Sequence, residues 1–72
     1  GIAKREGFTT PDANEAIVKS TAMKQCKDVY VLADTTKFGQ VSSVTFGEFA
    51  DGCILTEEIP EEYRESRNIL KV

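Results

Sequence analysis

The chain has 72 residues, a formal net charge of −3 and a hydrophobic content of 40%. A chain of this length forms one small domain with a modest core. It has no histidine and only two cysteines, Cys26 and Cys53, which excludes a zinc site and a disulfide framework. The charge balance also excludes a basic surface for nucleic acid.

Both cysteines lie in apolar stretches of sequence and are predicted to pack in the core of a protein in a reducing compartment. The sequence starts GIAKREG, without an initiator methionine or the pattern of a signal peptide. It has no apolar run long enough to cross a bilayer. These features predict a cytoplasmic fragment of a longer protein, with no role at a membrane.

The first ten residues show neither a helical nor an alternating hydrophobic period. We interpret them as an incoming connection, with Gly1-Ile2 as the tail of a strand. Gly7 suits a turn that needs a positive φ, after which Phe8 is expected to pack inward.

A helix is predicted over residues 11–27, with Thr10 as its N-cap and Pro11 at the first helical position. Its apolar residues spread around much of the circumference, which predicts burial on more than one side. Glu15 and Lys19 are four residues apart in the favourable order for an ion pair on the helix surface.

Residues 29–33, VYVLA, form a nearly unbroken apolar run rich in β-branched and aromatic residues. This pattern predicts a strand that is buried on both faces of a parallel sheet. The polar loop 34–39 follows directly. In open α/β sheets ligands bind at the carboxyl ends of strands, so this loop is the candidate binding segment.

The rest of the chain is predicted to alternate short strands with connections. Phe49 and Ala50 are expected to plug the core. The predicted elements are an edge strand 40–46, a connection 47–52, a strand 53–56, a short helix 59–66 and a closing strand 69–72. This order predicts an α/β domain with a mostly parallel sheet and flanking helices.

Two series of residues resemble a known family. They are GFTTPxxxEAxVK, from Gly7 to Lys19, and VxVLADTTKFG, from Val29 to Gly39. Thr56-Glu57 and the segment 59–62, IPEE, follow at matching spacing. Together they resemble the C-terminal sensor domain of DeoR-type bacterial transcriptional repressors. Within that family, the sequence more closely resembles repressors of phosphotransferase-system sugar operons, of the lactose or fructose type.

The resemblance implies a Rossmann-like sensor, related to sugar-phosphate isomerases and glucosamine-phosphate deaminases, that responds to a phosphorylated sugar. Residues 1–72 would then be the C-terminal part of one effector-binding domain. Its first half, and the winged helix-turn-helix that binds operator DNA, would lie outside this chain. We expect a homo-oligomer that needs no cofactor.

The resemblance also implies a role for Lys37, since the deaminase-like relatives place a phosphate-binding lysine after the corresponding strand. A lysine ammonium offers a phosphate up to three donors. Thr35 and Thr36 would donate hydroxyl or amide hydrogens, and Thr10 would face the ligand. Asp34 would either accept sugar hydroxyls or cap the loop's own amides.

Two other readings of the sequence stay open. One is a fragment of a sugar-phosphate isomerase or deaminase-like enzyme, and the other is a purely structural dimerisation module. We expect no enzyme, because the chain has no histidine and no second carboxylate that the sequence places beside Asp34. The acids between residues 57 and 65 are interpreted as a solvated face rather than a metal site.

Overall fold

The computed structural model describes all 72 residues, which form two three-stranded sheets and one α-helix. The antiparallel sheet has the order β1-β2-β4, with bounds Ile2–Ala3, Gly7–Thr10 and Val44–Gly47. The parallel sheet has the order β3-β5-β6, with bounds Tyr30–Leu32, Cys53–Thr56 and Ile69–Lys71. The α/β class is confirmed, but a single, mostly parallel sheet is not, because β1, β2 and β4 pair antiparallel.

The N-terminal segment, predicted as a connection, is instead the hairpin β1–β2. Ile2 pairs with Phe8 and Ala3 with Gly7, and β2 then pairs with β4. Gly7 has a φ of 82°, as the turn prediction required. These strands are too short to carry a period of their own, so their existence depends on a partner more than thirty residues away in the chain.

The helix α1 (Ala13–Gln25) starts later and ends earlier than predicted. Its N-cap is Asp12, whose carboxylate accepts hydrogen bonds from the backbone N–H groups of Asn14 (2.9 Å) and Glu15 (3.2 Å). The prediction of Thr10 as N-cap is wrong because Thr10 is the last residue of β2 and pairs with Val44.

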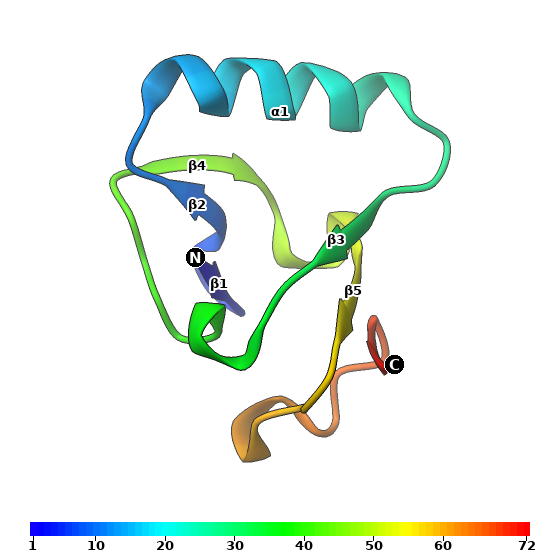
Figure 1. Cartoon of the computed structure of the whole chain (residues 1–72). Coiled ribbons are helices and arrows are strands. Elements are labelled where there is room, and N and C mark those ends of the chain that lie inside the picture. Colours follow the sequence, from blue (N-terminus) through cyan, green and yellow to red (C-terminus); the bar gives the residue numbers. More distant parts are fainter.

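The helix lies across β2 and β4 (Figure 1) and buries a single narrow face. Ala16 is buried and Met23 is half-buried, whereas Ile17 and Val18 are exposed. Within this chain α1 packs against the antiparallel sheet, so the predicted burial of a second side, against a neighbour outside the chain, stays a prediction. No helix combines the length and apolarity that crossing a bilayer requires.

The strand β3 stands at the edge of the parallel sheet, where it pairs only with β5. Tyr30 and Leu32 are 65% and 79% exposed, while Val31 between them is half-buried. The prediction of a strand buried on both faces is wrong here. The central strand β5 matches its predicted bounds, and Ile54 and Thr56 are fully buried.

The remaining connections are short 3₁₀ turns: η1 (Thr35–Lys37), η2 (Phe49–Asp51) and η3 (Glu61–Tyr63). The helix predicted over 59–66 is thus only the turn η3. The strand β4 lies at a sheet edge, as predicted, but starts at Val44 rather than residue 40. Phe49 packs on the core as predicted, whereas Ala50 is exposed.

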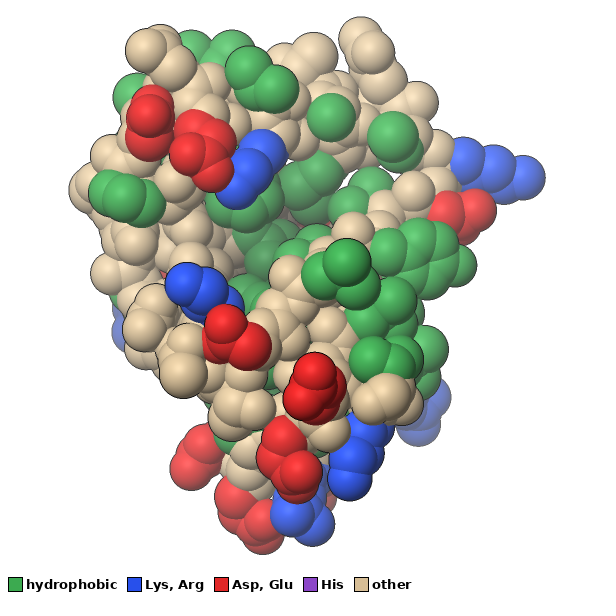
Figure 2. Space-filling model, viewed as in Figure 1, with side chains coloured by type: hydrophobic (Ala, Val, Ile, Leu, Met, Phe, Trp, Pro, Cys, Tyr) green, Lys and Arg blue, Asp and Glu red, His purple; other side chains and the backbone are tan.

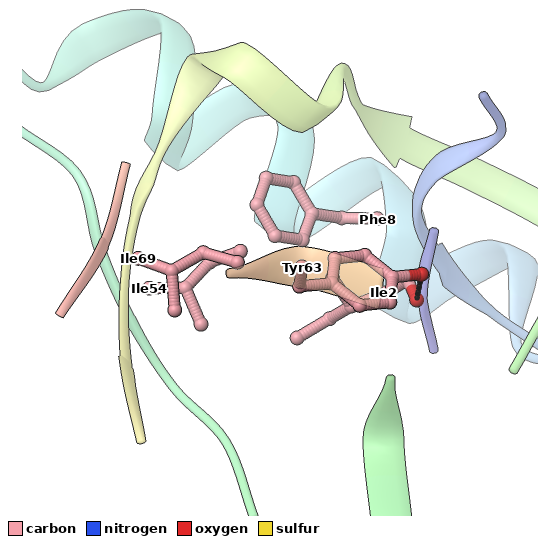
Figure 3. Close-up of a cluster of buried hydrophobic side chains, with 5 residues drawn as sticks. All are labelled: Ile2, Phe8, Ile54, Tyr63 and Ile69. Carbon is pink, nitrogen blue, oxygen red and sulfur yellow. Dashed lines mark hydrogen bonds between the residues drawn. The ribbon is translucent and has the colours of Figure 1, made fainter. Parts of the chain in front are cut away.

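The hydrophobic core joins the two sheets through five side chains, shown in Figure 3: Ile2, Phe8, Ile54, Tyr63 and Ile69. The hydroxyl of Tyr63 donates to the carbonyl of Ile2 (3.4 Å), and its ring lies 5.0 Å from that of Phe38. Because Phe38 directly follows Lys37 in the chain, this contact with the core fixes the position of the loop that carries Lys37.

Core packing of the cysteines is only partly found, because Cys53 is half-buried and Cys26 is exposed.

Candidate ligand-binding site

An open pocket of about 290 Å³ lies where α1, the antiparallel sheet and the end of β3 meet. Its walls include the apolar side chains of Ile2, Phe8 and Phe46, and its polar lining residues are Thr9, Thr10, Glu15, Lys19 and Lys37. Figure 2 shows a hollow beneath the helix, with hydrophobic side chains inside and charged side chains beside its mouth. Two of the residues predicted to bind ligand, Thr10 and Lys37, thus line one pocket.

The backbone around Lys37 is fixed on both sides. Its N–H donates to the carbonyl of Asp34 (3.1 Å), which closes the turn η1. Gly39, with a φ of 80°, donates its N–H to the carbonyl of Ile2 (2.7 Å), so the loop is attached to β1. The Lys37 side chain is exposed and makes no ion pair within 4.0 Å. Its ammonium group is therefore free to bind an anion.

A second lysine reaches the same pocket from α1. The Nζ atom of Lys19 lies 2.5 Å from Oε1 of Glu15 and 5.1 Å from the centre of the Phe46 ring. Lys19 and Lys37 both line this pocket, the first from α1 and the second from the turn η1.

The threonines at the end of β2 form the polar wall of this pocket. Thr9 and Thr10 are both buried. Oγ1 of Thr9 accepts a hydrogen bond from the N–H of Ser42 (2.9 Å), and Oγ1 of Thr10 accepts a longer one from the N–H of Asp12 (3.4 Å). In both bonds the threonine accepts, so its hydroxyl hydrogen remains available for a ligand.

Two other predicted residues, Asp34 and Thr35, line a neighbouring open pocket of about 390 Å³ with Thr56 and Glu57. The two pockets share Leu32 and Ala33 at the end of β3. Thr36 lines neither pocket. The structure thus places Lys37 and Thr10 in one pocket and Asp34 and Thr35 in its neighbour.

The carboxylate of Asp34 accepts hydrogen bonds from the hydroxyl of Thr36 and from its N–H (3.0 Å). The hydrogen bond from the Thr36 hydroxyl is the main cause that lowers the pKa of Asp34 below its ordinary value of 3.8. Desolvation opposes it, and the Thr36 N–H and the charge of Lys37 make smaller contributions that lower the pKa. Asp34 is thus the cap of its own loop, which is one of the two roles that the sequence left open. Its other role, accepting sugar hydroxyls, stays a prediction.

Sequence reasoning interpreted Glu15 and Lys19 as a surface ion pair, and the pair is present. It did not place the pair in the pocket with Lys37. The spacing of the two residues on a helix was readable from the sequence, but the direction in which they face was not. That direction depends on β2 and β4, which form the surface under α1.

The curated proteins include two significant relatives from Bacillus subtilis (strain 168). The chain is 41% identical, over its whole length, to "Uncharacterized HTH-type transcriptional regulator FruR", and covers 30% of that protein. It is 33% identical over 94% of its length to "HTH-type transcriptional regulator IolR", and covers 28% of it. The chain thus spans under a third of the length of these relatives. No solved structure matches it significantly.

A family model also matches most of the sequence. The model describes the DeoR C terminal sensor domain and matches residues 1–58. That range holds α1, the antiparallel sheet and every residue predicted to bind ligand. The chain belongs to the DeoR C-terminal sensor domain family.

Proposed function

We propose that this chain is part of the sensor domain of a DeoR-type transcriptional repressor of sugar-utilisation genes, and that the sensor binds a phosphorylated sugar. The observation that carries the proposal is the meeting of Lys37 and Thr10 at one open pocket whose walls include Ile2, Phe8 and Phe46. An ammonium group without an ion-pair partner and a hydroxyl suit the acceptor oxygens of a phosphate. The walls suit the carbon skeleton of a small ligand.

The 72 residues then form the C-terminal part of a single effector-binding domain, of Rossmann-like ancestry, in a cytoplasmic protein. Operator DNA is bound by a winged helix-turn-helix elsewhere in the same protein. Support comes from the two relatives, which are more than three times as long as the matched chain and are named as HTH-type transcriptional regulators.

The proposed mechanism is a shift between two arrangements of the regulator. A ligand moves such an equilibrium only if it binds one arrangement more tightly than the other. Phosphate bound at Lys37 would restrain the turn η1, and the hydrogen bond from Gly39 to Ile2 connects that loop to β1 and the antiparallel sheet. This link gives the ligand a route to the rest of the domain.

The test is a melting-temperature screen of the full-length regulator against phosphorylated sugars and their unphosphorylated parents, repeated with Lys37→Ala. A ligand at a hundredfold its dissociation constant stabilises the protein by about 2.7 kcal/mol. We expect a rise in melting temperature with phosphorylated sugars alone, and its loss in Lys37→Ala. The matched control is Lys24→Ala, since Lys24 lies on α1 outside this pocket.

Other outcomes would contradict the proposal. Equal shifts with unphosphorylated sugars would remove the role of phosphate. A screen without any shift would favour a structural dimerisation module. Conversion of a phosphorylated sugar to product by the purified protein would favour an isomerase or deaminase-like enzyme.

We also propose that the full-length regulator is a homo-oligomer, and that the isolated chain associates with itself through β3, an edge that the rest of the domain would cover in the full-length protein. Alternate residues of a strand face the same side, and Tyr30 and Leu32 form such an exposed apolar pair at a free sheet edge. Light scattering of the chain should give a mass above that of one copy, reduced in Tyr30→Lys. Val41→Lys, at an exposed residue before β4, should keep the wild-type mass. A monomeric wild-type chain would refute this proposal.

A further inference from the structure

We propose that Lys19 is a second phosphate-binding lysine of the pocket, and that Glu15 is a built-in counter-ion that the phosphate must displace. The inference rests on the proposed function of this pocket as a phosphate site. It goes further by assigning a competing charge to the site and a second group that holds the anion.

The position of Lys19 is set by two contacts within the pocket lining. Its ammonium group pairs with Glu15 one helical turn earlier (2.5 Å) and lies above the ring of Phe46 (5.1 Å). Phe46 is itself held by stacking on the buried ring of Phe8, at 6.0 Å between ring centres. The ammonium therefore stays at the pocket wall instead of moving freely in solvent.

The two lysines of the pocket differ in their partners. Lys37 has no carboxylate within 4.0 Å, whereas Lys19 has Glu15. Both side chains line the same pocket. An anion that enters between them gains two cations, but it also meets the carboxylate of Glu15. The phosphate can therefore bind Lys19 only by replacing Glu15 as its partner.

The exchange favours a phosphate over a singly charged anion. The Glu15 and Lys19 side chains are 48% and 46% exposed, and ion pairs of such exposure are weak. A phosphate ester carries close to two charges at neutral pH and has several acceptor oxygens, so it has enough charge and enough acceptors for the two lysines that line this pocket. A singly charged anion gains less from the two lysines and so displaces Glu15 less readily. Competition with Glu15 therefore selects ligands that carry about two negative charges.

The test measures the affinity of the full-length regulator for inorganic phosphate by isothermal titration at constant ionic strength. Glu15→Gln should bind phosphate about two- to fivefold more tightly, because the competing carboxylate is gone. Lys19→Gln should bind it about tenfold more weakly, through loss of a charged hydrogen bond. In the double variant, Glu15→Gln should add less tightening than it does alone, since the part of its effect that acts through Lys19 is gone.

Lys24→Gln, on the same helix but outside the pocket, is the matched control and should keep the wild-type affinity. Melting temperatures without phosphate check that each variant folds. Unchanged affinity in Lys19→Gln, with loss in Lys37→Ala, would overturn this inference and leave the proposed function standing. Unchanged affinity in both lysine variants would overturn the proposed function itself. Unchanged or weaker binding by Glu15→Gln would refute the role of that carboxylate as competitor.

Discussion

Phe8→Ala is expected to destabilise the chain by about 3–5 kcal/mol, which is the usual cost of deleting a buried phenylalanine ring. Phe8 is fully buried, stacks on Phe46 and belongs to the core that joins the two sheets. A small domain has only a few kcal/mol of stability to lose. We therefore expect most of the variant to be unfolded at room temperature, as measured by urea denaturation followed by circular dichroism.

Ile17→Ala is the control for Phe8→Ala, because it also removes a large apolar side chain. Ile17 is 64% exposed on α1 and contributes little to the core. Its loss should change the free energy of unfolding by less than about 1 kcal/mol. A similar loss of stability in the two variants would mean that the core is not centred on Phe8.

Gly7→Ala is expected to destabilise the chain by about 2–5 kcal/mol, from two separate causes. Gly7 has a φ of 82°, which is costly for any residue with a Cβ atom. A Cβ at this position would also lie only 2.2 Å from the carbonyl oxygen of Gly47 in β4. The strands β2 and β4 would have to separate, and overpacking of this kind adds about 1–3 kcal/mol.

Gly39→Ala separates these two causes. Gly39 has nearly the same φ, 80°, but a Cβ there would meet no atom within 4 Å. It should therefore cost only about 1–2 kcal/mol, the price of the backbone conformation alone. Urea denaturation of both variants measures the difference. Equal losses would show that the close approach of β2 to β4 is absent in solution.

Local features of the fold were predictable where a few neighbouring residues determine them. The turn at Gly7, the burial of Phe8 and the strand 53–56 depend on a glycine, an aromatic ring and a short apolar run. The sequence could not reveal that the segment 1–10 forms strands, because their pairing partner β4 lies far along the chain. The N-cap shifted from Thr10 to Asp12 for the same reason, since pairing with Val44 holds Thr10 in β2.

The candidate site was predictable only in part, because Lys37 and Thr10 line the pocket while Lys19 was interpreted only as half of a surface ion pair. The loop after β3 was placed correctly at the carboxyl end of a parallel strand, so Lys37 and Asp34 were expected near a pocket. Their division between two pockets follows from the turn η1, in which Asp34 faces Thr36 rather than the pocket of Lys37. Such a turn within a short polar segment has no hydrophobic period to reveal it.

The contact between Tyr63 and Ile2 has a consequence for synthesis of the protein. The two residues are 61 positions apart, and their hydrogen bond lies inside the core that joins the sheets. During translation the first hairpin therefore leaves the ribosome long before its core partner does. Contacts between such distant parts of a chain form slowly. The face of Ile2 that contacts Tyr63 consequently stays without this partner until the C-terminal part of this chain has been made.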